Sequence, residues 1–188
     1  MEELVKLDKE LFVFLNSLGS QPYDDFWSII TKQIYWTPLF IGIFYLIQKK
    51  VGWKNFGIII LSLALLITFT DQITNLFKNG FQRLRPCNDP EIKDIIRIVI
   101  HRNSFSFFSG HAANSMASTM FIFLIIRRYY KHTYLLFFFP LIFAYSRIYL
   151  GLHFPLDILT GYVFGIINGI LFYKLYSLFM RKYNQRAL

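Results

Sequence analysis

The chain has 188 residues, of which 55% are hydrophobic, 20% aromatic and only 16% charged, and Phe alone occurs 22 times. A soluble domain of this length has too little interior to bury so much apolar surface, so the composition disfavours a soluble enzyme and favours a protein surrounded by lipid. The net charge of +9 would suit nucleic acid, but the cations cluster beside apolar segments, as in membrane proteins, and we expect no nucleic-acid partner.

The first predicted element is an amphipathic helix near the N-terminus. Apolar residues recur there at helical spacing, and the stripe comprises Leu4, Leu7, Leu11, Phe12, Leu15 and Leu18. The segment is too short and too polar to cross a bilayer, so we expect it to lie in the membrane interface, within residues 1–24.

Five apolar segments follow, and about 20 apolar residues are needed to cross a hydrocarbon core about 30 Å thick. The predicted spans are Trp27–Ile47, Phe56–Phe77, Phe108–Ile126, the shorter Tyr134–Tyr149, and Leu156–Phe179. The expected fold is therefore all-α. It is a polytopic bundle of five transmembrane helices plus the interfacial helix, in a single domain of residues 1–188.

Charge predicts the orientation of this bundle. Three short basic segments contain no Asp or Glu, and their cations are Lys49, Lys50 and Lys54; Arg127, Arg128 and Lys131; and Arg181, Lys182 and Arg186. The positive-inside rule places all three on the cytoplasmic side, and five spans satisfy this without contradiction. The periplasmic or outer face of a bacterial cell membrane would then hold the N-terminal helix, the loop 78–107 and the turn around 150–155.

Three groups of polar residues are predicted on that outer face. In the first, Lys78 ends the second span and is followed by Arg83 and Arg85-Pro86. Cations at a lipid–water boundary can bind a phosphate, and the forked guanidinium of Arg matches phosphate oxygens. The alternative interpretation is a cluster that anchors the chain to headgroups.

The second group is Ser109-Gly110-His111, at the start of the third span. Ser109 is a good N-cap, and the N–H groups of a helix start form an anion site toward which His111 could donate a proton. The alternative is a capped helix with an interfacial histidine.

The third group is Ser146-Arg147, His153 and Asp157, around the turn between the last two spans. Asp157, four residues after His153, could orient its imidazole and leave the other ring nitrogen free to act. Ionisable residues at a membrane edge are functional candidates, although a purely structural cluster remains open.

The topology brings these groups to one face, where their cations, helix start, histidines and carboxylate would suit phosphoryl transfer. Their order and spacing resemble the type 2 phosphatidic acid phosphatase superfamily, which includes vanadium haloperoxidases. The signature of that family is Lys-x6-Arg-Pro, Pro-Ser-Gly-His and Ser-Arg-x5-His-x3-Asp, and it covers residues 78–157 here. The one departure is Phe108 in place of the Pro that opens the second motif, which affects loop rigidity rather than chemistry.

The resemblance implies a reaction through a phosphohistidine. His153 would be the nucleophile, Asp157 would hold it, and His111 would protonate the leaving group and then activate water. The phosphate-binding residues would be Lys78, Arg85, Ser109, Gly110 and Arg147. No cofactor is expected.

Several further residues and readings complete the prediction. Asp71 and Arg83 are candidate supporting residues, and Gly161, Gly165 and Gly169 predict a close helix-packing seam. A metal site of His111, His153 and Asp157 is disfavoured because the nearby Lys and Arg would repel the ion.

The favoured function is hydrolysis of the terminal phosphate of a membrane lipid. The candidate substrates are phosphatidic acid, phosphatidylglycerol phosphate, undecaprenyl diphosphate and lipid A 1-phosphate. The alternatives are a vanadate haloperoxidase, which would leave the membrane spans unexplained, and a non-catalytic lipid carrier or scramblase. No oligomeric state is predicted.

Overall fold

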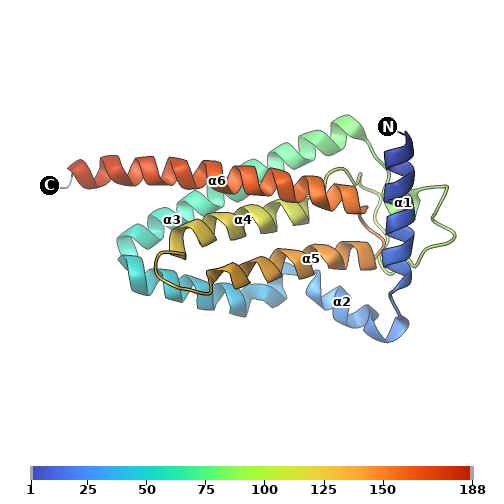
Figure 1. The fold of residues 1–188 in the computed structure, drawn as a ribbon, viewed down its shortest axis with the longest axis horizontal. Helices are drawn as coiled ribbons and strands as arrows, with labels where there is room; N and C mark the ends of the chain where they lie inside the picture. Colours follow the sequence, from blue (N-terminus) through green and yellow to red (C-terminus); the bar gives the residue numbers. More distant parts are fainter. Residues whose placement is uncertain (1, 187–188) are drawn as a thin grey trace.

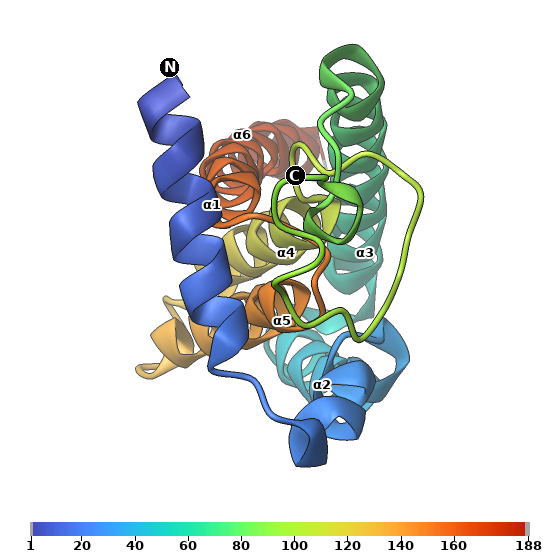
Figure 2. The same cartoon turned by 90° about the vertical axis from the view of Figure 1, so that its right-hand side faces the viewer.

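The computed structural model describes residues 2–186 and contains six α-helices in that part of the chain. They are α1 (Glu2–Ser17), α2 (Asp24–Ile30), α3 (Thr37–Phe81), α4 (Gly110–Ile126), α5 (Phe138–Tyr149) and α6 (Pro155–Arg186). Helices α3 to α6 run along the long axis, whereas α1 lies across one end of the bundle beside the long loop between α3 and α4 (Figures 1 and 2). The all-helical prediction is confirmed over the described residues.

Helix α3 is a pair of arms rather than one rod. Gly52 has φ 74° and ψ 165°, which is outside the helical region and is a conformation that glycine adopts at little cost. The chain reverses direction within α3 (Figure 1), and Ile43 and Ile47 of the first arm share a core cluster with Ile59 and Leu63 of the second. The two arms correspond to the first two predicted spans.

The N-terminal end of the first predicted span is wrong. The sequence predicts a continuous helix from Trp27, but α2 ends at Ile30 and a 3₁₀ helix, Gln33–Trp36, intervenes before α3 begins. Polar residues interrupt the apolar run at Lys32 and Gln33, and Pro38 suits the first turn of a new helix. The other predicted spans coincide with α4, with α5 and the 3₁₀ helix Thr133–Phe137 before it, and with α6.

Helix lengths support a membrane location without fixing the number of crossings. Within the described residues, two segments are long and apolar enough to span a bilayer, Gln33–Asn88 and Pro155–Tyr183, while Gly110–Ile126 and Thr133–Tyr149 are shorter apolar helices. A helix of 17 residues is about 26 Å long, near the lower limit for a span.

The glycine seam of α6 packs against α4, inside the bundle. A Cβ atom at Gly161 would lie 2.8 Å from the Ser109 carbonyl oxygen, and one at Gly165 would lie 2.5 Å from the Ala113 carbonyl oxygen. Only glycine permits this approach of the two backbones. The seam therefore fixes the beginning of α6 beside the beginning of α4.

The inner face of α1 is not its apolar stripe. Leu4, Leu7 and Leu11 are 55%, 56% and 46% exposed, whereas Asp8 and Asn16 are buried with Phe12 between them. The prediction that Phe12 belongs to the lipid-facing stripe is therefore wrong. The stripe faces outward, as an interfacial helix requires, and a separate face docks on the bundle.

Asn16 holds the C-terminal half of α1 in place. Its amide donates to the carbonyl oxygens of Arg97, Ile148 and Tyr149 at 3.1 Å, and its carbonyl oxygen accepts from the Arg97 N–H at 2.8 Å. Arg97 also pairs with Asp24 of α2 at 2.8 Å. The helix α1, the outer loop and the end of α5 are thus joined through one buried amide.

Candidate active site

Arg85 and His153 meet at the end of the bundle that α1 crosses. Arg85 follows α3, His153 lies between α5 and α6, and Arg85 Nη1 is 2.9 Å from His153 Nε2. The same guanidinium donates to the Leu152 carbonyl oxygen at 2.8 Å and to the Ser104 carbonyl oxygen at 2.8 Å. The first and third sequence motifs, 68 residues apart, are therefore in direct contact.

The contact with Arg85 indicates which nitrogen of His153 carries the proton. A guanidinium only donates, so Nε2 of a neutral His153 accepts and the ring proton is on Nδ1. Nδ1 faces Asp157 Oδ2 at 3.4 Å. This tautomer presents the Nε2 lone pair, which is the group that an attack on phosphorus requires.

Asp157 has partners besides the histidine. Its Oδ2 accepts from the Phe154 N–H at 3.0 Å, and its Oδ1 accepts from Arg83 Nη1 at 2.8 Å. The side chain is fully buried, and Arg83 offsets the cost of burying its charge. The carboxylate behind the histidine is therefore held at both oxygens.

Arg83 is also paired with Asp8 of α1. Its Nη2 lies 2.6 Å from Asp8 Oδ2, and Asp8 Oδ1 accepts from the Leu156 N–H at 2.9 Å. Burial raises the pKa of the Asp8 carboxyl, and the hydrogen bond from Arg83 offsets part of that rise. Arg83 thus bridges two carboxylates, one of which touches His153.

The second motif begins α4 next to Asp157. Ser109 is the N-cap and accepts from the Ala112 N–H at 3.4 Å, as predicted from its position, and its own N–H donates to the Asp157 carbonyl oxygen at 3.0 Å. His111, in the first turn, packs its ring against Phe143 of α5 at 5.4 Å between centroids. The second and third motifs are in contact through the backbone.

Lys78 completes the site from the α3 side. A Cβ atom at Gly110 would lie 3.6 Å from Lys78 Nζ and 3.3 Å from Thr74. Asp71, one of the predicted supporting residues, contacts the amides of Asn75 at 3.2 Å and Asn114 at 3.5 Å. Among the side chains of residues 2–183 no cation lies within 4.0 Å of Asp71, and its role in positioning one stays a prediction.

Arg147 approaches from α5 and is 2% exposed. One guanidinium nitrogen donates to Thr31 Oγ1 at 2.5 Å, and the buried Nε has no hydrogen-bond partner in the described part of the chain. Its carbonyl oxygen accepts from the Leu152 N–H at 2.9 Å, so the end of α5 also shapes the turn that carries His153.

Sequence reasoning missed Asp8, Thr31 and Ser104. Asp8 and Thr31 contact residues 75 and 116 positions away, and no spacing rule connects such pairs. The one available signal was the series Asp8, Phe12 and Asn16, which repeats every four residues beside the apolar stripe of α1.

Together these residues form a cationic site around the His153 imidazole. Lys78, Arg85 and Arg147 supply positive charge, and the start of α4 supplies N–H groups suited to an anion. No group of three or more His, Cys, Asp or Glu side chains in residues 2–186 is arranged to hold a metal ion. The arrangement suits binding and attack on a phosphoryl group.

The chain resembles known membrane phosphatases in sequence. Residues 57–181 match the family model of the PAP2 superfamily. The chain is 36% identical to a lipid A 4'-phosphatase of Bacteroides thetaiotaomicron, over 92% of this chain and 78% of that protein. It is 29% identical to a lipid A 4'-phosphatase of Porphyromonas gingivalis, over 94% of this chain and 75% of that protein.

Two solved structures share the fold. The crystal structure of a transmembrane PAP2 type phosphatidylglycerolphosphate phosphatase from Bacillus subtilis superimposes with a TM-score of 0.70 at 20% identity, covering 97% of this chain and 88% of that one. The crystal structure of Aquifex aeolicus LpxE gives a TM-score of 0.61 at 25% identity, over 88% and 93% of the two chains. The helix arrangement of this chain is therefore the fold of these two proteins.

Proposed function

The chain belongs to the PAP2 superfamily and is a phosphatase of membrane lipids, and we propose that it hydrolyses a lipid phosphate by double displacement through His153. Our first candidate substrate is the 4'-phosphate of a lipid A type glycolipid. Two relatives that carry the name lipid A 4'-phosphatase align with 92% and 94% of the chain. This replaces lipid A 1-phosphate, phosphatidic acid and the other lipids of the sequence prediction as the first choice.

The observation that carries the mechanism is the Arg85–His153–Asp157 contact. In the first step, Nε2 of His153 attacks phosphorus, the bond from phosphorus to the lipid oxygen breaks, and His111 donates a proton to that oxygen. In the second step, water attacks the phosphohistidine, His111 accepts a proton from it, and the phosphorus–nitrogen bond breaks to release inorganic phosphate.

Fixed positive charge lowers the barrier of both steps. Nε2 of His153 accepts a hydrogen bond from Arg85 at 2.9 Å, so the nucleophile and one oxygen-binding group are already adjacent. When a phosphoryl group binds, Arg85 would donate this hydrogen bond to a phosphoryl oxygen instead. Lys78, Arg147, Ser109 and the Gly110 N–H are our other candidates for binding the oxygens. Such charge is required because phosphate monoester hydrolysis is among the slowest uncatalysed reactions.

We place the enzyme in a bacterial inner membrane with the site on the periplasmic side. The five proposed spans are the two arms of α3, then α4, α5 and α6. The site lies at the end of the bundle that α1 crosses. The three basic segments without Asp or Glu lie toward the opposite end, in agreement with the positive-inside rule.

The substrate is tested by measuring phosphate release from a panel of lipids in detergent micelles, with and without EDTA. We expect release from lipid A bearing a 4'-phosphate to exceed release from lipid A 1-phosphate, phosphatidylglycerol phosphate, phosphatidic acid and undecaprenyl diphosphate. EDTA should leave the rate unchanged. A preference for a glycerophospholipid would refute the substrate, and loss of activity with EDTA would refute the metal-independent mechanism.

A further inference from the structure

We propose that Asp8 of α1 is a positioning residue for the catalytic histidine, acting through Arg83 and Asp157. This inference rests on the proposed role of His153. It assigns a catalytic task to a helix that lies outside the three sequence motifs and that the sequence indicates only as an interfacial anchor.

A continuous series of contacts connects the two residues. Asp8 is 2.6 Å from Arg83, Arg83 is 2.8 Å from Asp157, and Asp157 is 3.4 Å from Nδ1 of His153. The Arg83 guanidinium also lies 4.0 Å above the Phe154 ring, which leaves it little freedom to rotate. Asp8 is 3% exposed, so its charge is not simply solvated at the surface.

Asp8 also contacts the backbone at the start of α6, which carries Asp157. Its other oxygen accepts from the Leu156 N–H at 2.9 Å, one residue before Asp157 in the first turn of α6. Phe12, one helical turn further along α1, packs edge-on against Phe154 at 5.4 Å between centroids. The same face of α1 therefore fixes the guanidinium and the backbone that carries the orienting carboxylate.

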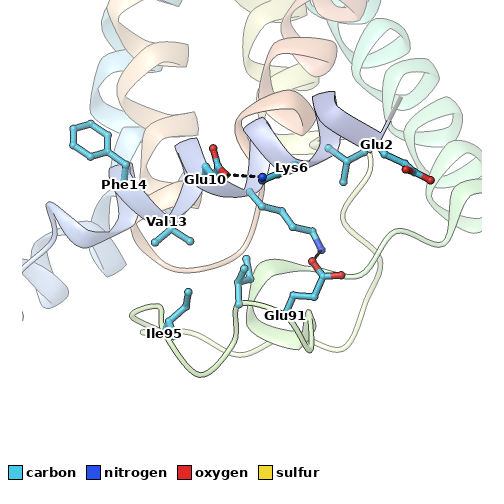
Figure 3. Close-up of a pocket in the computed structure, with 10 residues that line it drawn as sticks. Glu2, Lys6, Glu10, Val13, Phe14, Glu91 and Ile95 are labelled. Carbon is cyan, nitrogen blue, oxygen red and sulfur yellow. Dashed lines mark hydrogen bonds and ion pairs between the residues drawn. The ribbon is translucent and has the colours of Figure 1, made fainter.

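The neighbouring Lys9 is the matched control. It is also an ion-pair anchor of α1, with Asp89 at 2.8 Å and Glu91 at 2.9 Å, but it points to the outer loop and makes no contact with Arg83 or Asp157. Figure 3 shows this side of α1, where Val13 points toward Ile95 of the outer loop, and a cavity of about 920 Å³ lies between α1 and that loop.

The test compares Asp8→Asn, Asp8→Glu and Lys9→Gln. In Asp8→Asn the side chain can still accept from Leu156, but the charge that holds Arg83 is gone. We expect kcat to fall about 10- to 100-fold with KM unchanged, as for loss of a group that orients a catalytic residue. Asp8→Glu should recover part of kcat, and Lys9→Gln should keep it.

Two results would overturn the role of Asp8: an unchanged kcat in Asp8→Asn, or an equal loss of kcat in Lys9→Gln. If Asp8→Asn fails to fold, Arg83→Lys makes the same test, because an ammonium lacks the fork that bridges two carboxylates. Measuring His153→Ala in the same assay distinguishes a failure of the proposed nucleophile from a failure of the positioning role of Asp8. Activity in that variant would refute the proposed nucleophile, whereas an inactive His153→Ala beside a fully active Asp8→Asn would refute only the positioning role.

A separate observation at the opposite end of the bundle carries a second inference. A cavity of about 390 Å³ lies between the turn of α3, the end of α4 and α6, and no Asp or Glu is among the described residues that line it. Its polar lining includes Lys50, Asn55, Arg128, Tyr176 and Arg181. We infer that this cavity binds a phosphate-bearing anion, namely the headgroup of an acidic phospholipid, since basic pockets between membrane helices recognise such groups.

Thermal unfolding in neutral detergent tests this site without reference to hydrolysis. Phosphatidylglycerol should raise the Tm of the wild type and of Lys49→Gln/Lys182→Gln, relative to phosphatidylcholine, but not of Arg128→Gln/Arg181→Gln, which removes the same charge from the cavity. An equal rise in all three proteins would contradict the site. A sodium phosphate arm distinguishes the source: a matching rise there would refute a lipid headgroup in favour of a soluble anion.

Discussion

Replacing His153 with Ala should reduce phosphate release by at least about 10³-fold, because the proposed reaction loses its nucleophile and only charge and binding remain to act on the substrate. The measurement is release of inorganic phosphate from the preferred lipid by equal amounts of purified enzyme. KM should change little, since Arg85 keeps its bonds to Leu152 and Ser104 and can still bind an oxygen.

Two further variants make the result specific. His153 is 1% exposed, so its truncation also leaves a cavity, and His153→Gln fills that space with a side chain that cannot attack phosphorus. His132→Ala removes an exposed histidine whose ring contacts Tyr134 and should keep full activity. Substantial turnover by both folded His153 variants would contradict the assignment.

Gly165→Ala should lower the stability of the bundle, although alanine is the better helix former. The added Cβ would lie 2.5 Å from the Ala113 carbonyl oxygen and 3.0 Å from the Ala117 nitrogen, so α4 and α6 must separate. Overpacking of this kind costs about 1–3 kcal/mol. Activity should fall as well, because the α4–α6 contact holds Ser109 beside Asp157.

Gly57→Ala is the matched control for Gly165→Ala. Gly57 lies in the second arm of α3, and nothing lies within 4 Å of a Cβ atom built there. Alanine at an open helical site is stabilising by roughly 0.5–1 kcal/mol. Thermal unfolding in one detergent should therefore move in opposite directions for the two variants. A Tm for Gly165→Ala equal to that of Gly57→Ala would show that the seam is not close-packed.

Much of the fold follows from the sequence because length and apolarity dominate it. Helices α4 and α6 are where their apolar runs predict them, and Ser109 caps α4 as its position indicates. The predicted start of the first span was wrong for a local reason, because Lys32 and Gln33 interrupt a segment whose average hydropathy is still apolar. An average over 20 residues cannot resolve such a break.

The composition of the site was predictable, whereas its internal connections were not. Spacing placed Asp157 one turn after His153 and the cations on the same face. No pattern predicts that the Arg83 guanidinium donates to both Asp157 and Asp8, since these contacts join positions 74 and 75 residues apart. Long-range ion pairs depend on how the helices pack, and packing is decided by shapes that a single sequence does not display.

The most direct test of the double-displacement mechanism is to identify the phosphorylated residue. The enzyme is mixed with ³²P-labelled lipid and quenched in alkali within one turnover, which preserves phosphohistidine, and the labelled peptide is mapped by mass spectrometry. We predict a phosphoryl group on His153, formed and lost at rates that account for kcat. Label on another residue, or phosphate release with no phosphoenzyme at any quench time, would contradict the mechanism.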